Sequence, residues 1–485
     1  MLFNSGAFLL FFPIVVLLYF VVPKKFQMYW LLIASYYFYL AWNPKYGLLL
    51  LFVTATSYLA GMLQSKYNRK LMVGVSITLI LLVLFVFKYL LFAENLLTSA
   101  LHLIHVDVTM RVFDIVLPVG ISFYSFQAIG YVIDVYRGKI TVEKNFFKYA
   151  LFVSFFPQLV AGPIERSENL LKQLDTKKKF DFDHARDGFL LMLWGYFLKI
   201  VLADRIAIFV DDVYANPETY QGWFLIVATM LFAVQIYCDF YGYSTIAVGA
   251  AKILGIKLMD NFDAPYLATS VAGFWRRWHI SLTSWFKDYV YIPLGGSRRG
   301  RARRYLNIMI VFLLSGLWHG ANLSFVVWGG LNGLYQIIGD LLMPIRKKLA
   351  GILQLNTEVW SHKFAQAIGT FILVDFSWIF FRANGIRDAI VIIKNMFAVN
   401  NIWVLLDDEI YTALDRRNWY LMVICIVILL IADIFKLKKI SLRAELIKQN
   451  YLFRAVFVSM AIVAILTYGI WGSAYNATSF IYFQF

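Results

Sequence analysis

The residue best suited to chemistry in this sequence is a histidine that closes a hydrophobic run. His319 ends the stretch Phe312-Leu-Leu-Ser-Gly-Leu-Trp-His and stands between Gly316 and Gly320. Ionisable residues at membrane depth are functional hypotheses by default. Because an imidazole has an unperturbed pKa of about 6.5, it can take a proton from a hydroxyl near neutral pH. His319 is therefore a candidate general base; the alternative is a histidine hydrogen-bonded within helix packing, or one at a wet helix end.

A second histidine lies in a segment rich in Trp and Arg. In residues 274–286, helical spacing places Trp275 and His279 on one face, while Arg276 and Arg277 take others. A helix of this kind can lie in the membrane interface, with Trp at headgroup depth and Arg facing lipid phosphates. On spacing alone, we favour an interfacial helix over a catalytic one.

A cluster of arginines directly follows the pair Gly295-Gly296. These side chains can hold the phosphates of a nucleotide-type donor, bind anionic lipid, or simply mark the cytoplasmic side. The sequence leaves the three interpretations open. The cluster consists of Arg298, Arg299, Arg301, Arg303 and Arg304.

One carboxylate stands inside a long apolar run and is costly there unless it is paired or hydrogen-bonded. This residue, Asp239, either orients a catalytic group or holds helices together through the neighbouring tyrosines. Cys238 and Cys425 also lie in apolar runs, and we assign them no chemical role. The sequence has no metal-ligand pattern, Walker loop, dinucleotide fingerprint or nucleophile elbow, so we expect no metal site, no acyl-serine hydrolase and no ATP-driven pump.

The composition places these residues in a membrane protein. Of 485 residues, 61% are hydrophobic and 15% are charged, whereas about a quarter are charged in soluble proteins. The apolar residues form runs of the length that crosses ~30 Å of hydrocarbon as a helix, and they do not alternate as the strands of an outer-membrane barrel do. The sequence predicts an all-α polytopic membrane protein whose first hydrophobic run is retained.

The basic residues predict how the chain is threaded. With the N-terminus outside, most of the 45 Lys and Arg residues fall in cytoplasmic segments, as the positive-inside rule requires. The net charge of +16 therefore indicates topology and not nucleic-acid binding. This orientation gives about eleven or twelve transmembrane helices and places both termini outside the cytoplasm.

Two stretches are predicted to enter the membrane without crossing it. The first, near 149–165, contains Pro157 and the triplet Ala161-Gly162-Pro163, and the second, near 262–296, ends in a Pro-Leu-Gly-Gly turn. Non-helical backbone at membrane depth needs protein or a water-filled cavity around it. These segments predict an internal cavity reached from the cytoplasm. Without a repeat or linker, residues 1–485 are predicted to form one domain.

Several motifs, taken in order, resemble the membrane-bound O-acyltransferase family, in its bacterial branch of alginate and peptidoglycan O-acetyltransferases. Position 241 is Tyr where the family pattern has a small residue. The resemblance covers essentially the whole chain and rests on Ser154-Phe-Phe-Pro-Gln-Leu-Val-Ala-Gly-Pro-Ile164, Asp239-Phe-Tyr-Gly-Tyr-Ser244, Phe274-Trp-Arg-Arg-Trp-His-Ile-Ser-Leu282, Asp288-Tyr-Val-Tyr-Ile-Pro-Leu-Gly-Gly296, Ser315-Gly-Leu-Trp-His-Gly-Ala-Asn322 and Phe480-Ile-Tyr-Phe-Gln-Phe485.

The resemblance implies helices around a central tunnel, with an acyl thioester entering from the cytoplasm and the acceptor arriving from outside. It implies that His319 is catalytic and that His279 contributes to the same site. For His279 this reverses the preference for an interfacial helix that spacing alone gave. We expect phosphate contacts to the donor from Arg276, Arg277, Arg298 and Arg299. Around the catalytic residues we expect Asp239 and Asn322.

The expected function is transfer of acetyl from cytoplasmic acetyl-CoA across the bacterial inner membrane for O-acetylation of a polysaccharide such as alginate or peptidoglycan. The resemblance implies a separate extracytoplasmic acetyltransferase as partner. One alternative is a D-alanyl transfer protein of teichoic acid modification, which draws on a carrier-protein thioester. Another is a secondary transporter, which shares broken helices and a midplane cavity but forms no ester.

Overall fold

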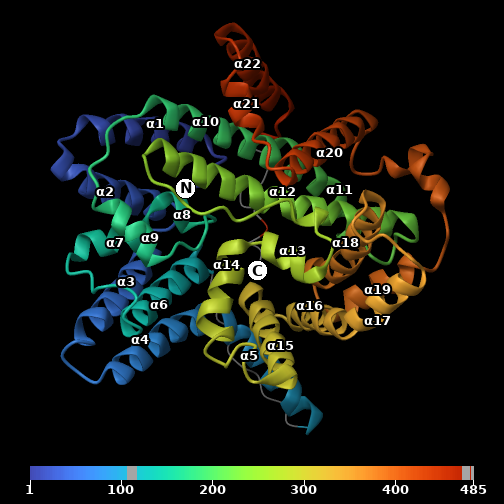
Figure 1. The fold of residues 1–485 in the computed structure, drawn as a ribbon, viewed down its shortest axis with the longest axis horizontal. Helices are drawn as coiled ribbons and strands as arrows, with labels where there is room; N and C mark the ends of the chain where they lie inside the picture. Colours follow the sequence, from blue (N-terminus) through green and yellow to red (C-terminus); the bar gives the residue numbers. More distant parts are fainter. Residues whose placement is uncertain (106–116, 472–480, 482–485) are drawn as a thin grey trace. The chain divides into compact units, whose positions relative to one another are not determined.

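The computed structural model describes residues 1–105, 117–471 and 481, and all regular structure within them is helical (Figure 1). This confirms the predicted all-α class. The terminal motif Phe480–Phe485 lies outside the described residues except for Ile481.

The described chain divides into two compact units. The first holds Met1–Met192 and Tyr243–Met259, and the second holds Leu193–Gly242 and the described residues from Asp260 to Trp471. Helices α10 (Phe182–Tyr196) and α12 (Trp223–Ile253) contribute residues to both units. The prediction of one domain over 1–485 stays a prediction.

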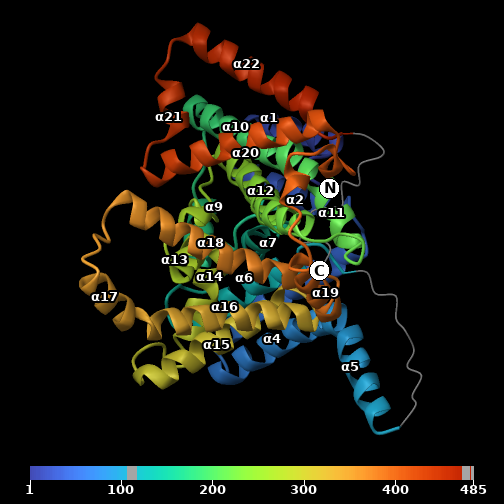
Figure 2. The same cartoon turned by 90° about the vertical axis from the view of Figure 1, so that its right-hand side faces the viewer.

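The first unit is built on helices α3, α4 and α6, which lie against one another, with α2 and α7 beside them (Figures 1 and 2). Its helices are α1 (Gly6–Val21), α2 (Gln27–Leu40), α3 (Tyr46–Leu63), α4 (Arg69–Leu84), α5 (Leu90–Leu103), α6 (Ile121–Tyr136), α7 (Phe146–Ser154), α8 (Phe156–Leu159) and α9 (Ser167–Leu174).

The second unit contains the two predicted catalytic histidines. Helices α15 and α16 run side by side as a hairpin, and α18 lies against α16 (Figures 1 and 2). Its helices, besides part of α12, are α11 (Asp204–Ala215), α13 (Val271–Arg277), α14 (Ile280–Phe286), α15 (Gly300–His319), α16 (Leu323–Leu341), α17 (Met343–Ile352), α18 (Trp360–Arg382), α19 (Ile386–Met396), α20 (Arg416–Leu437), α21 (Leu442–Ile447) and α22 (Tyr451–Tyr468).

Six helices within the described residues are long and apolar enough to cross a membrane, which is what a multi-pass membrane protein requires. Among the described residues, α1 is also apolar but has only 16 residues, and α2 has 14 and α6 has 16. The predicted total of eleven or twelve crossings therefore stays a prediction. The six are Tyr46–Leu63, Arg69–Thr98, Trp223–Ile253, Trp360–Arg382, Arg416–Leu437 and Tyr451–Tyr468.

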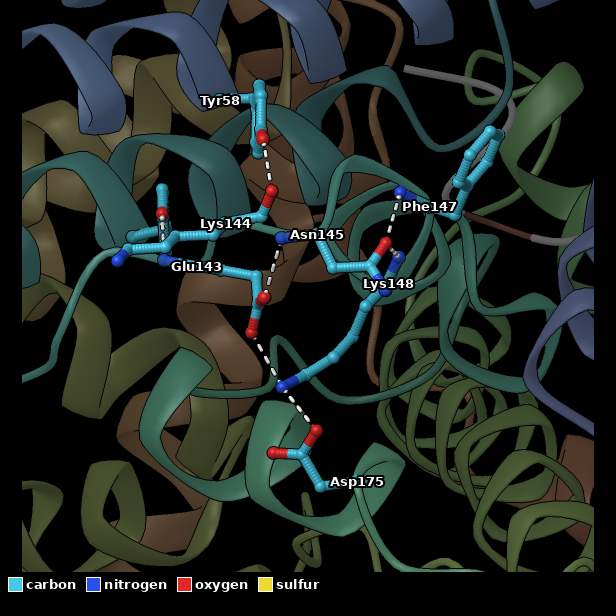
Figure 3. A network of polar contacts seen from close by, with 8 residues as sticks. Tyr58, Glu143, Lys144, Asn145, Phe147, Lys148 and Asp175 are labelled. Atoms are coloured by element: carbon cyan, nitrogen blue, oxygen red, sulfur yellow. Dashed lines mark hydrogen bonds and ion pairs between the residues drawn. The ribbon is translucent and has the colours of Figure 1, made fainter. Parts of the chain in front are cut away.

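The segment near 149–165 is interrupted where its prolines and glycine predict. Helix α7 ends at Ser154 and α8 has only four residues. The start of α7 is fixed to the end of α9, because Lys148 Nζ lies 2.6 Å from both Glu143 Oε2 and Asp175 Oδ1 (Figure 3). Entry into the membrane from one side stays a prediction for this segment and for 262–296.

Candidate active site

His319 occupies the C-terminal end of α15, directly before the link to α16. Its side chain is buried, with 4% of the residue exposed. Three aromatic rings surround the imidazole with nearly perpendicular or steeply inclined planes. Their centroids lie 4.9 Å away for Trp318, 5.1 Å for Trp328 and 5.2 Å for Phe381.

Glycines bring the backbones of the His319 hairpin together. A Cβ atom on Gly316 would collide with the carbonyl oxygen of Phe325, and one on Gly329 with that of Phe312. A Cβ on Gly320, directly after His319, would enter the ring of Phe325. Small residues permit this close approach between membrane helices, so these glycines fix where His319 lies.

His279 lies at a break between two short helices. It precedes α14 with a left-handed backbone, φ 44° and ψ 55°, which is uncommon for a residue other than glycine. The segment pairs with a distant part of the chain, since Asn261 O accepts from Ile280 N at 2.9 Å and Asn261 Oδ1 from Ser281 N at 3.2 Å. The helical spacing assumed for 274–286 is therefore wrong, because these bonds stabilise a new helix start.

The environment of His279 is interior and apolar. Only 1% of the residue is exposed, and its ring lies 4.6 Å from that of Phe240. Burial lowers the pKa of the His279 imidazole to about 3, so the ring is neutral at pH 7 and can donate or accept a hydrogen bond without carrying charge. A His279 side chain that faces lipid or water does not fit this burial, whereas the depth of the segment in the membrane stays a prediction.

One indole joins the two histidines. The ring of Trp318 lies 6.0 Å from that of His279 and 4.9 Å from that of His319. The structure thus brings the two predicted catalytic residues to the same aromatic cluster, although they are 40 positions apart in the chain. Two imidazoles in such water-poor surroundings can move a proton and hydrogen-bond a developing negative charge.

Asp239 has the partner that its burial requires. Lys199 Nζ lies 2.6 Å from Asp239 Oδ1 and 2.7 Å from Asp204 Oδ1, and all three side chains are buried. We call these residues the ion triad. The residue after Asp239 is Phe240, whose ring contacts His279, so the ion triad holds the backbone that presents this contact.

Asn322 shapes the turn that follows His319. Its side-chain oxygen accepts from Ser324 N at 3.0 Å and begins α16, and its Nδ2 donates to the carbonyl oxygen of Asn384 at 3.0 Å. Asn322 therefore fixes the turn between α15 and α16 to the segment after α18.

The predicted donor contacts fall in two places. Arg276 and Arg277 form the last turn of α13, next to His279, and Arg277 Nη1 donates to Asp263 O at 3.3 Å. Arg298 and Arg299 are exposed before α15. Because α15 has 20 residues and rises about 1.5 Å per residue, this second pair lies roughly 30 Å from His319 along the helix.

Two of the three remaining arginines of the cluster hold local structure. Arg303 Nε donates to Leu294 O at 3.3 Å, and Arg304 Nη2 lies 3.1 Å from Asp340 Oδ1. In the part of the chain that the structure describes, no group of three or more His, Cys, Asp or Glu side chains could hold a metal ion.

Sequence reasoning missed polar residues that support the site. Lys199 lies in an apolar run, as does Asn332, which is fully buried on α16. A polar side chain within a hydrophobic run is the signal that selected Asp239, and it would have selected both.

Comparison with known proteins gives the class. Residues 140–373 match the membrane-bound O-acyltransferase family. The probable alginate O-acetylase AlgI of Pseudomonas putida is 32% identical over the full length of both chains. The peptidoglycan O-acetyltransferase of Helicobacter pylori is 31% identical over 86% of this chain and 84% of that protein. A more distant relative, the teichoic acid D-alanyltransferase of Bacillus subtilis, is 26% identical over 43% of this chain and 55% of that protein.

The chain therefore belongs to the membrane-bound O-acyltransferase family. Within it, the chain belongs to the branch of the alginate and peptidoglycan O-acetyltransferases, and it is a multi-pass membrane O-acyltransferase. This confirms the family resemblance that the sequence motifs indicated.

Proposed function

We propose that the enzyme transfers acetyl from cytoplasmic acetyl-CoA across the bacterial inner membrane, for O-acetylation of an extracytoplasmic polysaccharide. The names of two relatives support alginate or peptidoglycan as the acceptor class. The structural observation that supports the proposal is the contact of Trp318 with both His279 and His319, because a site shared by the two imidazoles requires them to lie in one cluster.

In this mechanism His319 removes the proton from an acceptor hydroxyl. The oxygen attacks the thioester carbonyl, and neutral His279 donates a hydrogen bond to the developing oxyanion. The C–S bond then breaks, and the leaving thiolate takes the proton from the His319 imidazolium. The aromatic surroundings of both rings support this assignment, because hydrogen bonds to a charged oxygen strengthen when water is excluded.

The donor's phosphates are assigned to Arg276, Arg277, Arg298 and Arg299. The exposure of Arg298 and Arg299 supports phosphate binding, since guanidinium groups bind phosphate with paired hydrogen bonds. Their position at the far end of α15 fits a long donor that reaches towards the histidines.

The acceptor side of the proposal includes a partner. The resemblance supports a separate extracytoplasmic acetyltransferase that receives the acetyl group and modifies the glycan. The basic segments of the sequence support extracytoplasmic termini.

A D-alanyl transfer reaction is the second candidate, supported by the relative in Bacillus subtilis. The two functions differ in the donor, which is acetyl-CoA in one and a carrier-protein thioester in the other. Donor preference in membrane vesicles therefore separates them.

The test is transfer of radiolabelled acetyl from acetyl-CoA in inverted membrane vesicles. It compares the wild type, His319→Ala and vesicles that lack the protein. Label on a lumenal acceptor only with the intact histidine supports the proposal. No label from acetyl-CoA, with label from an acyl carrier protein, moves the function to D-alanyl-type transfer. Label carried across without ester formation indicates a transporter.

A further inference from the structure

A buried amide connects the three elements that surround the histidines. Asn332 lies on α16, one turn after Trp328, and none of it is exposed. Its Oδ1 accepts from Trp275 Nε1 of α13 at 3.1 Å, and its Nδ2 donates to Ser377 Oγ of α18 at 3.1 Å. The same Nδ2 donates to Trp328 O at 2.9 Å.

The chemistry of the partners fixes the orientation of this amide. An indole N–H can only donate, and a backbone carbonyl can only accept. The oxygen of Asn332 must therefore face Trp275, and its NH₂ group must face Trp328 O and Ser377. The Ser377 hydroxyl is then free to donate to Val374 O, which lies at 2.7 Å. The Trp275 N–H, the Asn332 amide and the Ser377 hydroxyl all have hydrogen-bond partners in this row.

The residues tied by the row belong to an aromatic wall that contacts His319 and reaches the residue before His279. Trp328 contacts His319, and its ring lies 5.6 Å from that of Trp275. Next to Ser377, Trp378 stacks on Trp328 at 5.6 Å and lies 5.2 Å from Trp278, the residue before His279.

Aromatic contacts alone do not fix the positions of α13, α16 and α18 relative to one another, because such contacts are individually weak and tolerate several geometries. A fully satisfied buried hydrogen-bond row specifies one arrangement. The need is greatest for α13, which has only seven residues and leads directly into the left-handed backbone of His279.

We propose that Asn332 is a positioning residue for acyl transfer, which holds the α13–His279 segment in register with His319 through its bonds to Trp275 and Ser377. This inference rests on the proposed function of the two histidines. Asn332 does not touch the reacting groups; it acts through the wall. Displacement of a catalytic group by about 1 Å can cost about 100-fold in rate.

The test variant is the double substitution Trp275→Phe with Asn332→Leu. It removes the Trp275 donor and the Asn332 acceptor together. The two other partners of Asn332 keep a hydrogen bond, because Ser377 Oγ still donates to Val374 O and Trp328 O lies inside α16, where the helix supplies a backbone donor. Leu keeps the branched outline of Asn, and Phe keeps an aromatic ring against α16. The matched control is Thr370→Val on α18, whose hydroxyl donates to Gln366 O at 2.8 Å within the same helix.

Two measurements decide the proposal in detergent-purified, folded protein: kcat for acetyl transfer, and hydrogen–deuterium exchange of peptides within 271–286. We expect the double variant to lose about 10- to 100-fold in kcat with little change in KM for acetyl-CoA, and to exchange faster in 271–286. Thr370→Val should match the wild type in both. A folded double variant with unchanged kcat overturns the proposal.

The exchange measurement separates this proposal from the proposed function. If the wild type transfers nothing from acetyl-CoA, the donor assignment fails. Faster exchange of 271–286 in the double variant then still supports the positioning role, whereas unchanged exchange overturns it.

Discussion

Removal of the ammonium group from the ion triad should destabilise the second unit more than the loss of any exposed ion pair would. In Lys199→Met, the side chain remains of similar length, but Asp204 and Asp239 lose the cation that lies 2.7 and 2.6 Å from them. All three side chains are at most 3% exposed, so water cannot replace the lost partner. Breaking a buried pair in this way costs about 3–5 kcal/mol, against about 0–1 kcal/mol for a surface pair.

Thermal unfolding in detergent measures this cost. For a unit of this size, each kcal/mol shifts Tm by about 2 °C, so Lys199→Met should unfold on the order of 5–10 °C below the wild type. The neutral triple variant Lys199→Met, Asp204→Asn, Asp239→Asn should recover much of the loss, because it leaves no uncompensated charge. A single variant within 1 °C of the wild type, or a triple variant no more stable than the single, would refute the reasoning.

Three further outcomes follow from the site. Gly316→Ala should cost about 1–3 kcal/mol and most of the activity, measured by Tm and acetyl transfer, whereas Gly330→Ala should be tolerated because its added Cβ meets only an ordinary 3.7 Å contact. Arg298→Ala should raise KM for acetyl-CoA about fivefold, equivalent to about 1 kcal/mol, while Lys347→Ala on α17 leaves KM unchanged. The folded-state pKa of His279 is about 3, below its unfolded value of about 6.5. Stability should therefore be full above pH 6.5 and decline as the pH falls towards 3, and His279→Gln should flatten that decline in a plot of Tm against pH.

The sequence predicted features that depend on residue type and local pattern. Hydrophobic runs predicted the all-α membrane fold, and Pro157 with its neighbours predicted the interruption after α7. The need for a partner at Asp239 was also predictable, because a buried carboxylate is costly whichever residue neutralises it. The identity of the partner was not, since Lys199 is 40 positions away.

The break at His279 shows why the remainder of the site was beyond local reasoning. The spacing of Trp275, His279 and Leu282 fits one helix face, yet a new helix begins at Ile280, where the backbone N–H groups donate to Asn261. Hydrogen bonds between distant segments override helix periodicity, and their existence depends on the tertiary structure. The family resemblance selected His279 where periodicity did not.

The π-helical turn Phe197–Ala203 carries Lys199, and such a turn amounts to one residue inserted into an α-helix. Each residue of an α-helix rotates the chain by about 100°. Deleting one residue of this turn after Lys199 would restore a regular helix and rotate Lys199 by about that angle relative to the residues that follow the turn. The lysine would then face away from Asp239 with no change in its chemical type. The pairing is thus encoded by the length of the chain as much as by its composition, and a single-codon deletion would be more harmful here than most substitutions.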